Sequence, residues 1–367
     1  MDEALIVGAG PAGLSAALAL SARGVAVTVF EQHPAPPPRV CGAFINPEGT
    51  RHLATLGVLD DVTQTGAVAV TTARVVAPRG RDVEIRLNRD GVSGLAVPRP
   101  VLEQVLADSL IRRGGVVAWG SRVARADRDG SGWRVAIRTG ASTSERWAPL
   151  LVAADGRFSS LSRRHPARER QGWFGWNATW AGVQKPPGHL SLYFYRSGYV
   201  GVLVFGDGFA NVCGLTRRRL GESASWALVC EAALEDQLAL QRLLDGAKRV
   251  SPFRGVGPLP FSAAMWSAGG PLLAGDAAAV GDPYWGEGIS RALGTGPALL
   301  ESLRDVRELS DATLRPVYER VWRRHYHPRL RLGTGTRLIL ACPRLMAAAL
   351  GIAPTALLRR LAAVAHR

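Results

Sequence analysis

The sequence predicts an α/β fold that begins with a β-α-β unit, carries an inserted mixed or antiparallel β-sheet and ends in a helical segment. Three observations predict it. Apolar runs and a Gly-rich turn alternate over the first 31 residues, the composition turns aromatic from about 170 to 217, and helical periodicity with many arginines follows residue 311. A chain of 367 residues is long enough for two or three substructures, at roughly 150 residues per domain.

The first unit is defined by its apolar pattern and its turn. Ala4–Val7 is a short apolar run, as expected of a buried parallel strand. Leu14–Arg23 is rich in Ala and Leu, which favours a helix, and Gly24 ends it. Val25–Phe30 then predicts a second strand, which completes a β-α-β unit.

The same reasoning predicts the elements that follow. Pro47 suits the first turn of a helix, apolar and β-branched runs predict strands, and Leu102, Leu106 and Leu110 recur at helical spacing. In chain order we expect a helix from Pro47 to about Leu56, strands over Val68–Val76 and Val83–Leu87, a helix over Arg99–Arg113, strands at Trp133–Ile137, Arg146–Trp147, Leu150–Ala154 and Leu272–Ala274, and a helix from about Gly288.

The aromatic stretch predicts a separate sheet. It contains Trp173, Phe174, Trp176, Trp180, Tyr193, Phe194, Tyr195, Tyr199 and Phe205. A change of composition of this kind indicates a second domain. The predicted domains are a discontinuous first domain over 1–66, 92–165 and 255–310, an inserted domain over 67–91 and 166–254, and a helical segment over 311–367.

Charge and cysteine content exclude several classes of protein. Lys and Arg total 45 against 30 Asp and Glu, a net charge of +15, and residues 320–367 hold ten Arg and no acid. No nucleic-acid module accompanies this charge, so no nucleic-acid partner is expected. Cys41, Cys213, Cys230 and Cys342 lie far apart without metal-ligand spacing, so we expect no metal and a reducing cytoplasm.

The N-terminal turn carries the first chemical motif, Gly8-x-Gly10-x-x-Gly13. The first glycine permits the tight turn, the second lets a pyrophosphate approach the backbone, and the third lets the helix pack on the strand. The helix start offers free N–H groups to phosphates. Glu31 stands where an acid accepts hydrogen bonds from a ribose hydroxyl. These residues predict a site for the ADP half of a dinucleotide.

Two later segments identify which dinucleotide is expected. Leu151–Gly156 runs from a strand into Asp-Gly, and Leu272–Ala278 runs into Gly-Asp and is followed by Asp282–Ile289, with the pattern P-x-x-G-x-G. With the glycine turn, these motifs resemble the FAD-dependent superfamily of aromatic hydroxylases and geranylgeranyl reductases. The resemblance covers roughly residues 1–160 and 255–305. It departs from the family at Ala153, where Gly is frequent, and at Ser162, where Arg is usual.

The resemblance implies non-covalent FAD and assigns roles to individual residues. Asp276 would accept hydrogen bonds from the ribityl chain, Arg99 would reach FAD, and the backbone of Val123 would meet the adenine. The helix near Gly288 would direct its N–H groups at the flavin pyrimidine. The implied FAD contacts are Gly8, Gly10, Pro11, Ala12, Gly13, Glu31, Gln32, Arg39, Cys41, Gly42, Arg99, Val123, Asp155, Gly156, Gly275, Asp276, Pro283, Gly286, Gly288 and Ile289.

The reaction is left with three alternatives, because the cofactor carries the chemistry. The first is a monooxygenase that hydroxylates a hydrophobic or aromatic small molecule through a flavin hydroperoxide. The second is a reductase that saturates C=C bonds of a prenyl or polyketide substrate, favoured by Cys41-Gly42 and by Glu287 in G-E-G-I, but its Y-x-W-x-F-P signature is broken after Tyr199. The third is a flavin-binding protein without turnover. NAD(P)H is expected as a transient electron donor.

No side chain is assigned to catalysis. The pocket candidates are Cys41, Tyr284, Trp285, Trp176 and Tyr199. The Arg-rich C-terminus has three interpretations: a solvated basic face, adhesion to an anionic membrane, or docking of an acidic carrier domain. The chain begins with an acidic Met1-Asp2-Glu3 and has no apolar run of about 20 residues. A cytoplasmic protein is therefore expected, with membrane association as the alternative.

Overall fold

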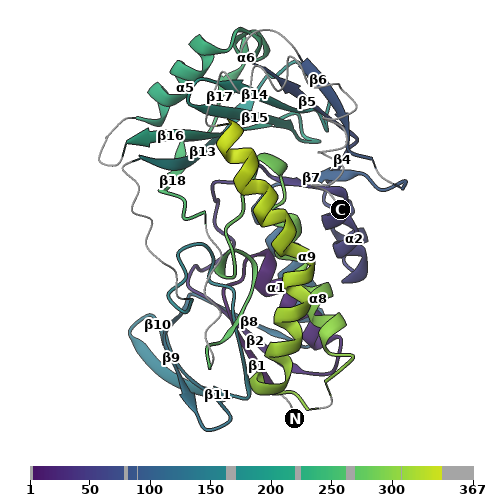
Figure 1. Ribbon diagram of the computed structural model, residues 1–367, viewed down its shortest axis with the longest axis vertical. Helices are drawn as coiled ribbons and strands as arrows, with labels where there is room; N and C mark the ends of the chain where they lie inside the picture. Colours follow the sequence, from purple (N-terminus) through teal and green to yellow (C-terminus); the bar gives the residue numbers. More distant parts are fainter. Residues whose placement is uncertain are drawn as a thin grey trace.

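The computed structural model describes residues 3–77, 82–88, 90–162, 171–219, 225–261, 269–306 and 308–340. Two bodies are evident in Figure 1: a lower body around a five-stranded sheet and an upper body around an eight-stranded sheet. The long helix α9 runs beside the lower body toward the upper one. Within the described part of the chain, no helix has the length and apolar character to cross a bilayer.

The lower body is built on a parallel sheet. Its strand order is β19 (Leu272–Leu273), β12 (Leu150–Ala153), β1 (Glu3–Val7), β2 (Ala26–Glu31) and β8 (Val116–Trp119). Every neighbouring pair in it is parallel. Parallel sheets are covered on both faces, so their strands are apolar throughout. All the carboxyl ends therefore meet at one edge of the sheet.

Alternate residues of these strands pack against two different layers. Ala4 and Ile6 of β1 join a core with α1 (Pro11–Ser21), α4 (Arg99–Arg112) and α8 (Thr295–Ser302). Leu5 and Val7 pack instead against an antiparallel meander. The meander consists of β9 (Ser121–Asp129), β10 (Gly132–Thr139) and β11 (Ser142–Ala148). The sheet thus lies between a helical layer and a β-layer.

The upper body is the predicted aromatic sheet. Its order is β17 (Lys248–Arg249), β13 (Gln171–Ala181), β16 (Ala210–Arg219), β15 (Gly198–Val204), β14 (Leu190–Tyr195), β5 (Thr72–Val76) and β6 (Asp82–Arg86), and β18 (Arg254–Val256) also pairs with β13. One face is covered by α5 (Trp226–Asp236) and α6 (Leu238–Leu244), and the other face meets the lower body.

The remaining elements are short, apart from α9. They are β3 (Phe44–Ile45), β7 (Gly94–Ala96) and β4 (Val68–Val70) in a small antiparallel sheet, the helices α2 (Pro47–Thr55) and α3 (Leu59–Gln64), the 3-10 turns η1 (Gly275–Ala277) and η2 (Pro283–Trp285), and the helices α7 (Gly288–Leu293) and α9 (Asp311–Leu340). The Asn46 side chain caps α2 by accepting from the N–H of Gly49 at 3.0 Å.

Most predicted elements are confirmed, and two predictions are corrected. The predicted strand Val68–Val76 is two strands, β4 and β5, which belong to different sheets. The first helix begins at Pro11 rather than Leu14, because proline suits the first helical position. The strand β9 and the helix pair α5–α6 were not predicted. The predicted domain limits stay a prediction.

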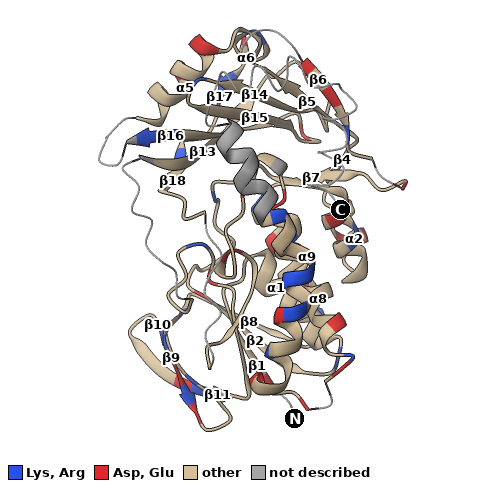
Figure 2. Ribbon diagram, in the orientation of Figure 1, with Lys and Arg blue, Asp and Glu red and all other residues tan. Residues whose placement is uncertain are grey.

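The basic C-terminal segment is described only as far as Leu340. Figure 2 shows Lys and Arg along α9. Arg320, Arg323 and Arg324 are exposed there; Arg323 pairs with Glu319 at 3.4 Å, and Arg324 pairs with Glu301. Residues 341–367 lie outside the described residues. A membrane or carrier partner for this segment stays a prediction.

Trp176 is a correction to the predicted pocket. Its side chain is fully buried on the face of the upper sheet that α5 and α6 cover. There its indole N–H donates to Oγ1 of Thr216 at 3.1 Å, and its ring lies 5.7 Å from that of Phe253. Side chains alternate between the faces of a strand, so Trp176 points away from the lower body and cannot line a pocket between the two bodies.

Replacement of Trp176 tests this placement. We expect Trp176→Phe to lower the free energy of unfolding by about 1–3 kcal/mol, through lost volume and the lost bond to Thr216. FAD affinity should not change. Denaturant unfolding and FAD titration measure the two effects, with Trp147→Phe, on the half-exposed Trp147 of β11, as the control. Weaker FAD binding at unchanged stability would contradict the placement.

Candidate functional site

Four neighbouring strands end at one edge of the lower sheet, and each leads into a predicted site residue. Glu31 ends β2, Gly8 follows β1, Asp155 follows β12 and Asp276 follows β19. Neighbouring strands lie about 4.8 Å apart, so the three intervals from β2 to β19 span roughly 14 Å. The edge can therefore receive a long, extended ligand.

The glycine turn at the centre of this edge is crowded in two places. Gly8 has a φ of +102°, and a Cβ there would meet the carbonyl oxygen of Ala154 at 2.5 Å. A Cβ on Gly13 would collide with the carbonyl oxygen of Gly8. Only glycine, which has no Cβ, fits at both positions and tolerates the positive φ at the first of them. Gly10, at the N-cap of α1, leaves the first N–H groups of that helix without a side-chain cap.

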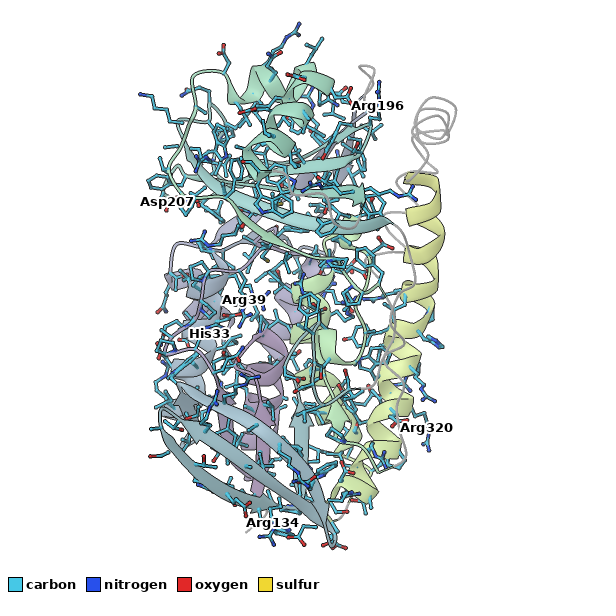
Figure 3. The ribbon with its side chains drawn as sticks, turned by 90° about the vertical axis from the view of Figure 1, so that its left-hand side faces the viewer. His33, Arg39, Arg134, Arg196, Asp207 and Arg320 are labelled. Carbon is cyan, nitrogen blue, oxygen red and sulfur yellow. The ribbon has the colours of Figure 1, made fainter. Side chains whose placement is uncertain are left out.

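The Glu31 side chain is held in place by hydrogen bonds from nearby backbone N–H groups. Its carboxylate accepts from the N–H of Ala9 at 3.0 Å and from that of His33 at 3.1 Å, and Nη2 of Arg39 lies 3.8 Å away. The side chain is 5% exposed. Each oxygen keeps an acceptor position for a further donor. His33 and Arg39 lie in the zone below the upper sheet (Figure 3).

Arg99 lies over the glycine turn. Its Nη2 is 3.5 Å from the position that a Cβ on Gly10 would take. Its Nε donates to Oε1 of Glu103 at 2.7 Å, one helical turn later on α4. Glu103 is 1% exposed, and burial raises its pKa although Arg99 acts in the opposite direction. Sequence analysis missed Glu103, although its i, i+4 spacing from Arg99 is a usable signal.

Asp155 and Asp276 provide the acidic groups on the other side of the turn. Oδ2 of Asp155 accepts from the N–H of Ser160 at 2.9 Å, and Oδ1 is buried without a hydrogen-bond partner among the described residues. Nη2 of Arg291 donates a hydrogen bond to Oδ1 of Asp276 at 3.1 Å, and Nε of Arg157 lies 3.6 Å from Oδ2 of the same carboxylate. Both arginines were missed by sequence analysis because no local motif links them to Asp276.

The loop between η2 and α7 leaves room for a ligand at one residue. Gly286 has a φ of +64°, and a Cβ there would press on the ring of Phe44 at 2.8 Å. A Cβ on Gly288 would meet nothing within 4 Å. This is the backbone at which the resemblance places the flavin ring.

A second loop, residues 39–43, is fixed to the upper sheet by amide side chains. Nδ2 of Asn211 donates to the carbonyl oxygen of Cys41 at 2.9 Å. Nδ2 of Asn177 donates to Oδ1 of Asn211 at 3.2 Å. The Cys41 thiol accepts from the N–H of Ala43 at 3.3 Å. Cys41 and Gly42 are thus held against the face of the sheet that meets the lower body.

Four rings close the space between η2 and the upper sheet. We call Trp173, Phe194, Tyr199 and Tyr284 the aromatic cluster; all are buried. Tyr284 lies 5.1 Å from Tyr199, is stacked on Phe194 at 6.2 Å and 14°, and meets Trp173 edge-on at 6.2 Å. Burial raises the pKa of Tyr199 well above its usual value, so this hydroxyl stays protonated. The side chain of Trp285 lies outside the described residues.

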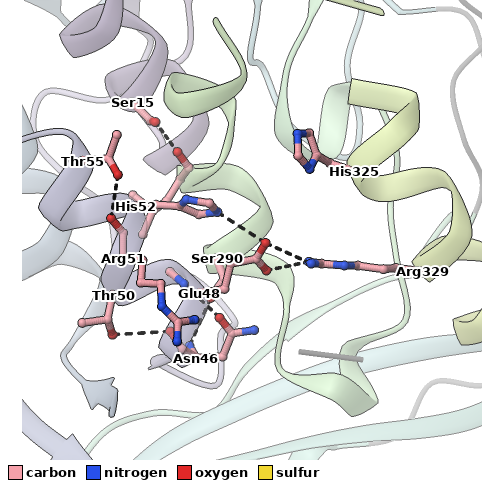
Figure 4. Close-up of polar contacts among 12 residues, drawn as sticks. Ser15, Asn46, Glu48, Thr50, Arg51, His52, Thr55, Ser290, His325 and Arg329 are labelled. Atoms are coloured by element: carbon pink, nitrogen blue, oxygen red, sulfur yellow. Dashed lines mark hydrogen bonds and ion pairs between the residues drawn. The ribbon is translucent and has the colours of Figure 1, made fainter. Parts of the chain in front are cut away.

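We call the loop between η2 and α7, residues 286–287, the flavin loop. Polar contacts near it tie α2, α7 and α9 together (Figure 4). Arg329 of α9 donates through Nη1 and Nη2 to the carboxylate of Glu48 on α2, at 2.5 and 3.0 Å. His52 lies 3.7 Å from the same carboxylate. Oγ of Ser290 on α7 accepts from the N–H of Asn46 at 3.1 Å. The C-terminal helix is thereby linked to the helix that follows the flavin loop.

Three further predicted contacts can be placed relative to this edge, and their contact with FAD stays a prediction. Val123 is in β9, directly after β8, and β8 pairs with β2, so Val123 lies on the Glu31 side. Gln32 follows Glu31 and is exposed. Gly275 has a φ of +55° and abuts Ala12. The glycine turn, the Asp155 oxygen that has no partner among the described residues, and the open backbone at Gly288 therefore fit FAD. Glu31 would hold its ribose and Arg99 its pyrophosphate.

Removal of the Arg99 charge should weaken FAD binding. Loss of a charge-assisted hydrogen bond corresponds to roughly a 10- to 100-fold higher Kd for Arg99→Met. This variant also leaves Glu103 buried and unpaired, so its stability should fall. The double variant Arg99→Met/Glu103→Gln should regain stability but not affinity. FAD titration and thermal unfolding separate the two effects, and recovered affinity in the double variant would contradict this role of Arg99.

Asp276→Asn should raise the Kd for FAD by about tenfold or more, because it removes a charged acceptor and the partner of Arg291. Asp305→Asn is the control, since Asp305 is exposed beyond α8 in the same body. Titration of both apoproteins with FAD by fluorescence quenching gives the comparison. Equal affinities for the two variants would show that Asp276 does not contact the cofactor.

Comparison with known proteins agrees with this geometry. Residues 1–307 match the family described as FAD binding domain. The FAD-dependent urate hydroxylase of Klebsiella pneumoniae subsp. pneumoniae is 30% identical over 184 residues, 48% of this chain and 47% of that protein, so the match spans about half the length of that relative.

Two further proteins are similar over most of the chain. The digeranylgeranylglycerophospholipid reductase of Methanosarcina acetivorans is 26% identical over 351 residues, 88% of this chain and 80% of that protein. A flavoprotein/dehydrogenase structure from Cytophaga hutchinsonii superposes with a TM-score of 0.82 at 18% identity, over 100% of this chain and 92% of that one. The match over residues 1–307 covers most of the chain, and the protein is therefore a member of the family described as FAD binding domain.

Proposed function

We propose that the protein is a monooxygenase that hydroxylates an aromatic or hydrophobic small molecule held between the flavin ring and the upper sheet. The observation that carries this proposal is the aromatic cluster, because its four rings converge beside η2 on the face that meets the cofactor domain. Flat, apolar side chains of this kind bind a planar ring through stacked and edge-on contacts. A flexible prenyl chain would not need them.

The residues of the site have separable tasks in such a reaction. The aromatic cluster would orient the substrate ring and exclude water. The Tyr199 hydroxyl stays protonated and so could donate a hydrogen bond to a polar group of the substrate. Bound FAD would supply the redox chemistry, taking electrons from a reductant and activating dioxygen. NAD(P)H is proposed as that reductant, and it would bind only transiently.

A reductase acting on C=C bonds is the second candidate. Cys41-Gly42 and G-E-G-I around Glu287 favour it, and a relative named as a reductase aligns over 88% of this chain. In that case, the space beside the flavin would have to open into a channel for an alkene chain. A flavoprotein that binds a metabolite or partner without redox turnover is the third candidate.

Oxygen use distinguishes the candidates. The reconstituted protein should be reduced anaerobically and then mixed with ¹⁸O₂ and a panel of phenols, indoles and prenyl alcohols. A monooxygenase places one ¹⁸O atom in the product and the other in water, as mass spectrometry of the product shows. Saturation of a prenyl double bond without oxygen would overturn the proposal in favour of the reductase. Retained FAD with no product and no spectral change across donors would favour the third candidate.

A matched pair of variants connects the reaction to the aromatic cluster. Phe194→Leu removes one ring of the cluster from the upper sheet and leaves Tyr284 of η2 unchanged in sequence, and it should raise KM for an aromatic substrate. Phe253→Leu, on the covered face of the same sheet, should leave KM unchanged. Equal KM values for both variants would contradict the proposal that the substrate binds at the face carrying the aromatic cluster.

A further inference from the structure

Glu287 is a buried acid in the flavin loop that the proposed reaction does not use. It stands between Gly286 and Gly288, directly before α7, and is 8% exposed. Its Oε1 is buried and has no hydrogen-bond partner in the part of the chain that the structure describes. Burying an acid in this way costs free energy unless the acid is paired or carries a proton.

The cations near Glu287 are already engaged with other acids. Arg329 of α9 donates both terminal nitrogens to Glu48. Arg291 of α7 donates to Asp276 at 3.1 Å. Ionised Glu287 would therefore compete with Glu48 for Arg329 or with Asp276 for Arg291, although Nε of Arg291 has no hydrogen-bond partner among the described residues. Asp276 is the predicted acceptor for the ribityl chain.

Two other titratable groups packed around this site bring no positive charge. His52 of α2 lies 3.7 Å from Glu48, and burial lowers its pKa, so it is neutral at pH 7. Tyr326 of α9 is buried and its pKa is raised, so it too is neutral. His325 faces Glu301 at 3.2 Å. Glu48 already binds Arg329 through both of its carboxylate oxygens, so a proton on Glu287 leaves that ion pair undisturbed.

The pKa of Glu287 follows from these surroundings. Burial raises it to about 7, Glu48 acts in the same direction, and Arg329 and Arg291 act in the opposite direction. The carboxyl group therefore changes its charge near neutral pH, whereas an exposed glutamate is ionised there.

We propose that Glu287 is a positioning residue of the flavin site that binds a proton, and that the protein holds FAD more tightly when Glu287 is protonated. Ionised Glu287 would draw Arg291 from Asp276 or Arg329 from Glu48. It would also place a negative charge in the loop that approaches the flavin. Protonated Glu287 leaves both ion pairs intact. The proposal rests on FAD binding, to which the family points, and not on the hydroxylation proposed above.

FAD affinity as a function of pH is the direct test. Titration of the apoprotein with FAD at constant ionic strength, from about pH 6 to about pH 8.5, should show Kd rising by about tenfold with a midpoint near 7. Glu287→Gln mimics the protonated group, so its Kd should equal the low-pH value of the natural protein and stay constant over this range.

Two further variants control for other causes. Glu301→Gln removes a different contact with α9, at the partly exposed Glu301, and should follow the natural pH profile. Arg329→Met should shift the midpoint of the profile upward, because it removes a cation that favours ionised Glu287. An unchanged pH profile in Glu287→Gln would overturn the proposal, as would a flat profile in the natural protein.

Unfolding of the apoprotein gives a readout that needs no cofactor. The pKa of Glu287 is higher in the folded state than its unfolded value of 4.5, so the folded protein binds more protons between about pH 4.5 and pH 7. The free energy of unfolding should therefore fall over that interval and level off above it. Glu287→Gln should lack this part of the decline and be the more stable protein at pH 8. Equal stability of the two proteins at pH 8 would contradict a buried, proton-binding Glu287.

Discussion

The shared carboxyl edge of β2, β1, β12 and β19 is the constraint on which the rest of the site depends. Parallel pairing aligns the strand ends, so residues more than 240 positions apart in the chain lie next to each other along one edge of the sheet. Glu31 lies at one end of this line and Asp276 at the other, with the glycine turn between them. Any ligand that contacts both must be extended along the edge, and FAD has that shape.

The upper sheet completes the site because its two faces have different chemistry. Alternation along each strand sends Trp176 and Tyr193 to the layer under α5 and α6, and sends Trp173 and Tyr199 toward η2. The Asn177–Asn211 pair then fixes the loop that carries Cys41 against this second face. The proposed substrate site thus lies between the two bodies, which is where small-molecule sites commonly lie.

Local motifs were enough to predict the cofactor edge, because each consists of neighbouring residues whose conformation is set locally. Gly8 and Gly13 are dictated by clashes inside one turn, and Asp276 by the strand before it. The contact partners were not predictable in this way. Arg291 reaches Asp276 across a loop, and Arg329 reaches Glu48 from a helix 281 positions away.

Assignments within the aromatic sheet required three-dimensional information. Sequence shows that Trp173 and Trp176 belong to one strand, but not which face the helices α5 and α6 cover. The break between β4 and β5 is likewise invisible, because Val68–Val76 remains apolar and β-branched across it. Turns between sheets depend on the tertiary environment and not on local propensity.

A crystal structure of the protein with FAD bound is the most direct test of the central claim, that one extended dinucleotide lies along this edge. The account predicts a ribose hydroxyl within hydrogen-bond distance of Glu31, the ribityl chain beside Asp276, and the flavin ring against the backbone of Gly288, facing the aromatic cluster. An FAD molecule bound with its ends reversed, or a flavin ring on the far side of the upper sheet, would contradict it.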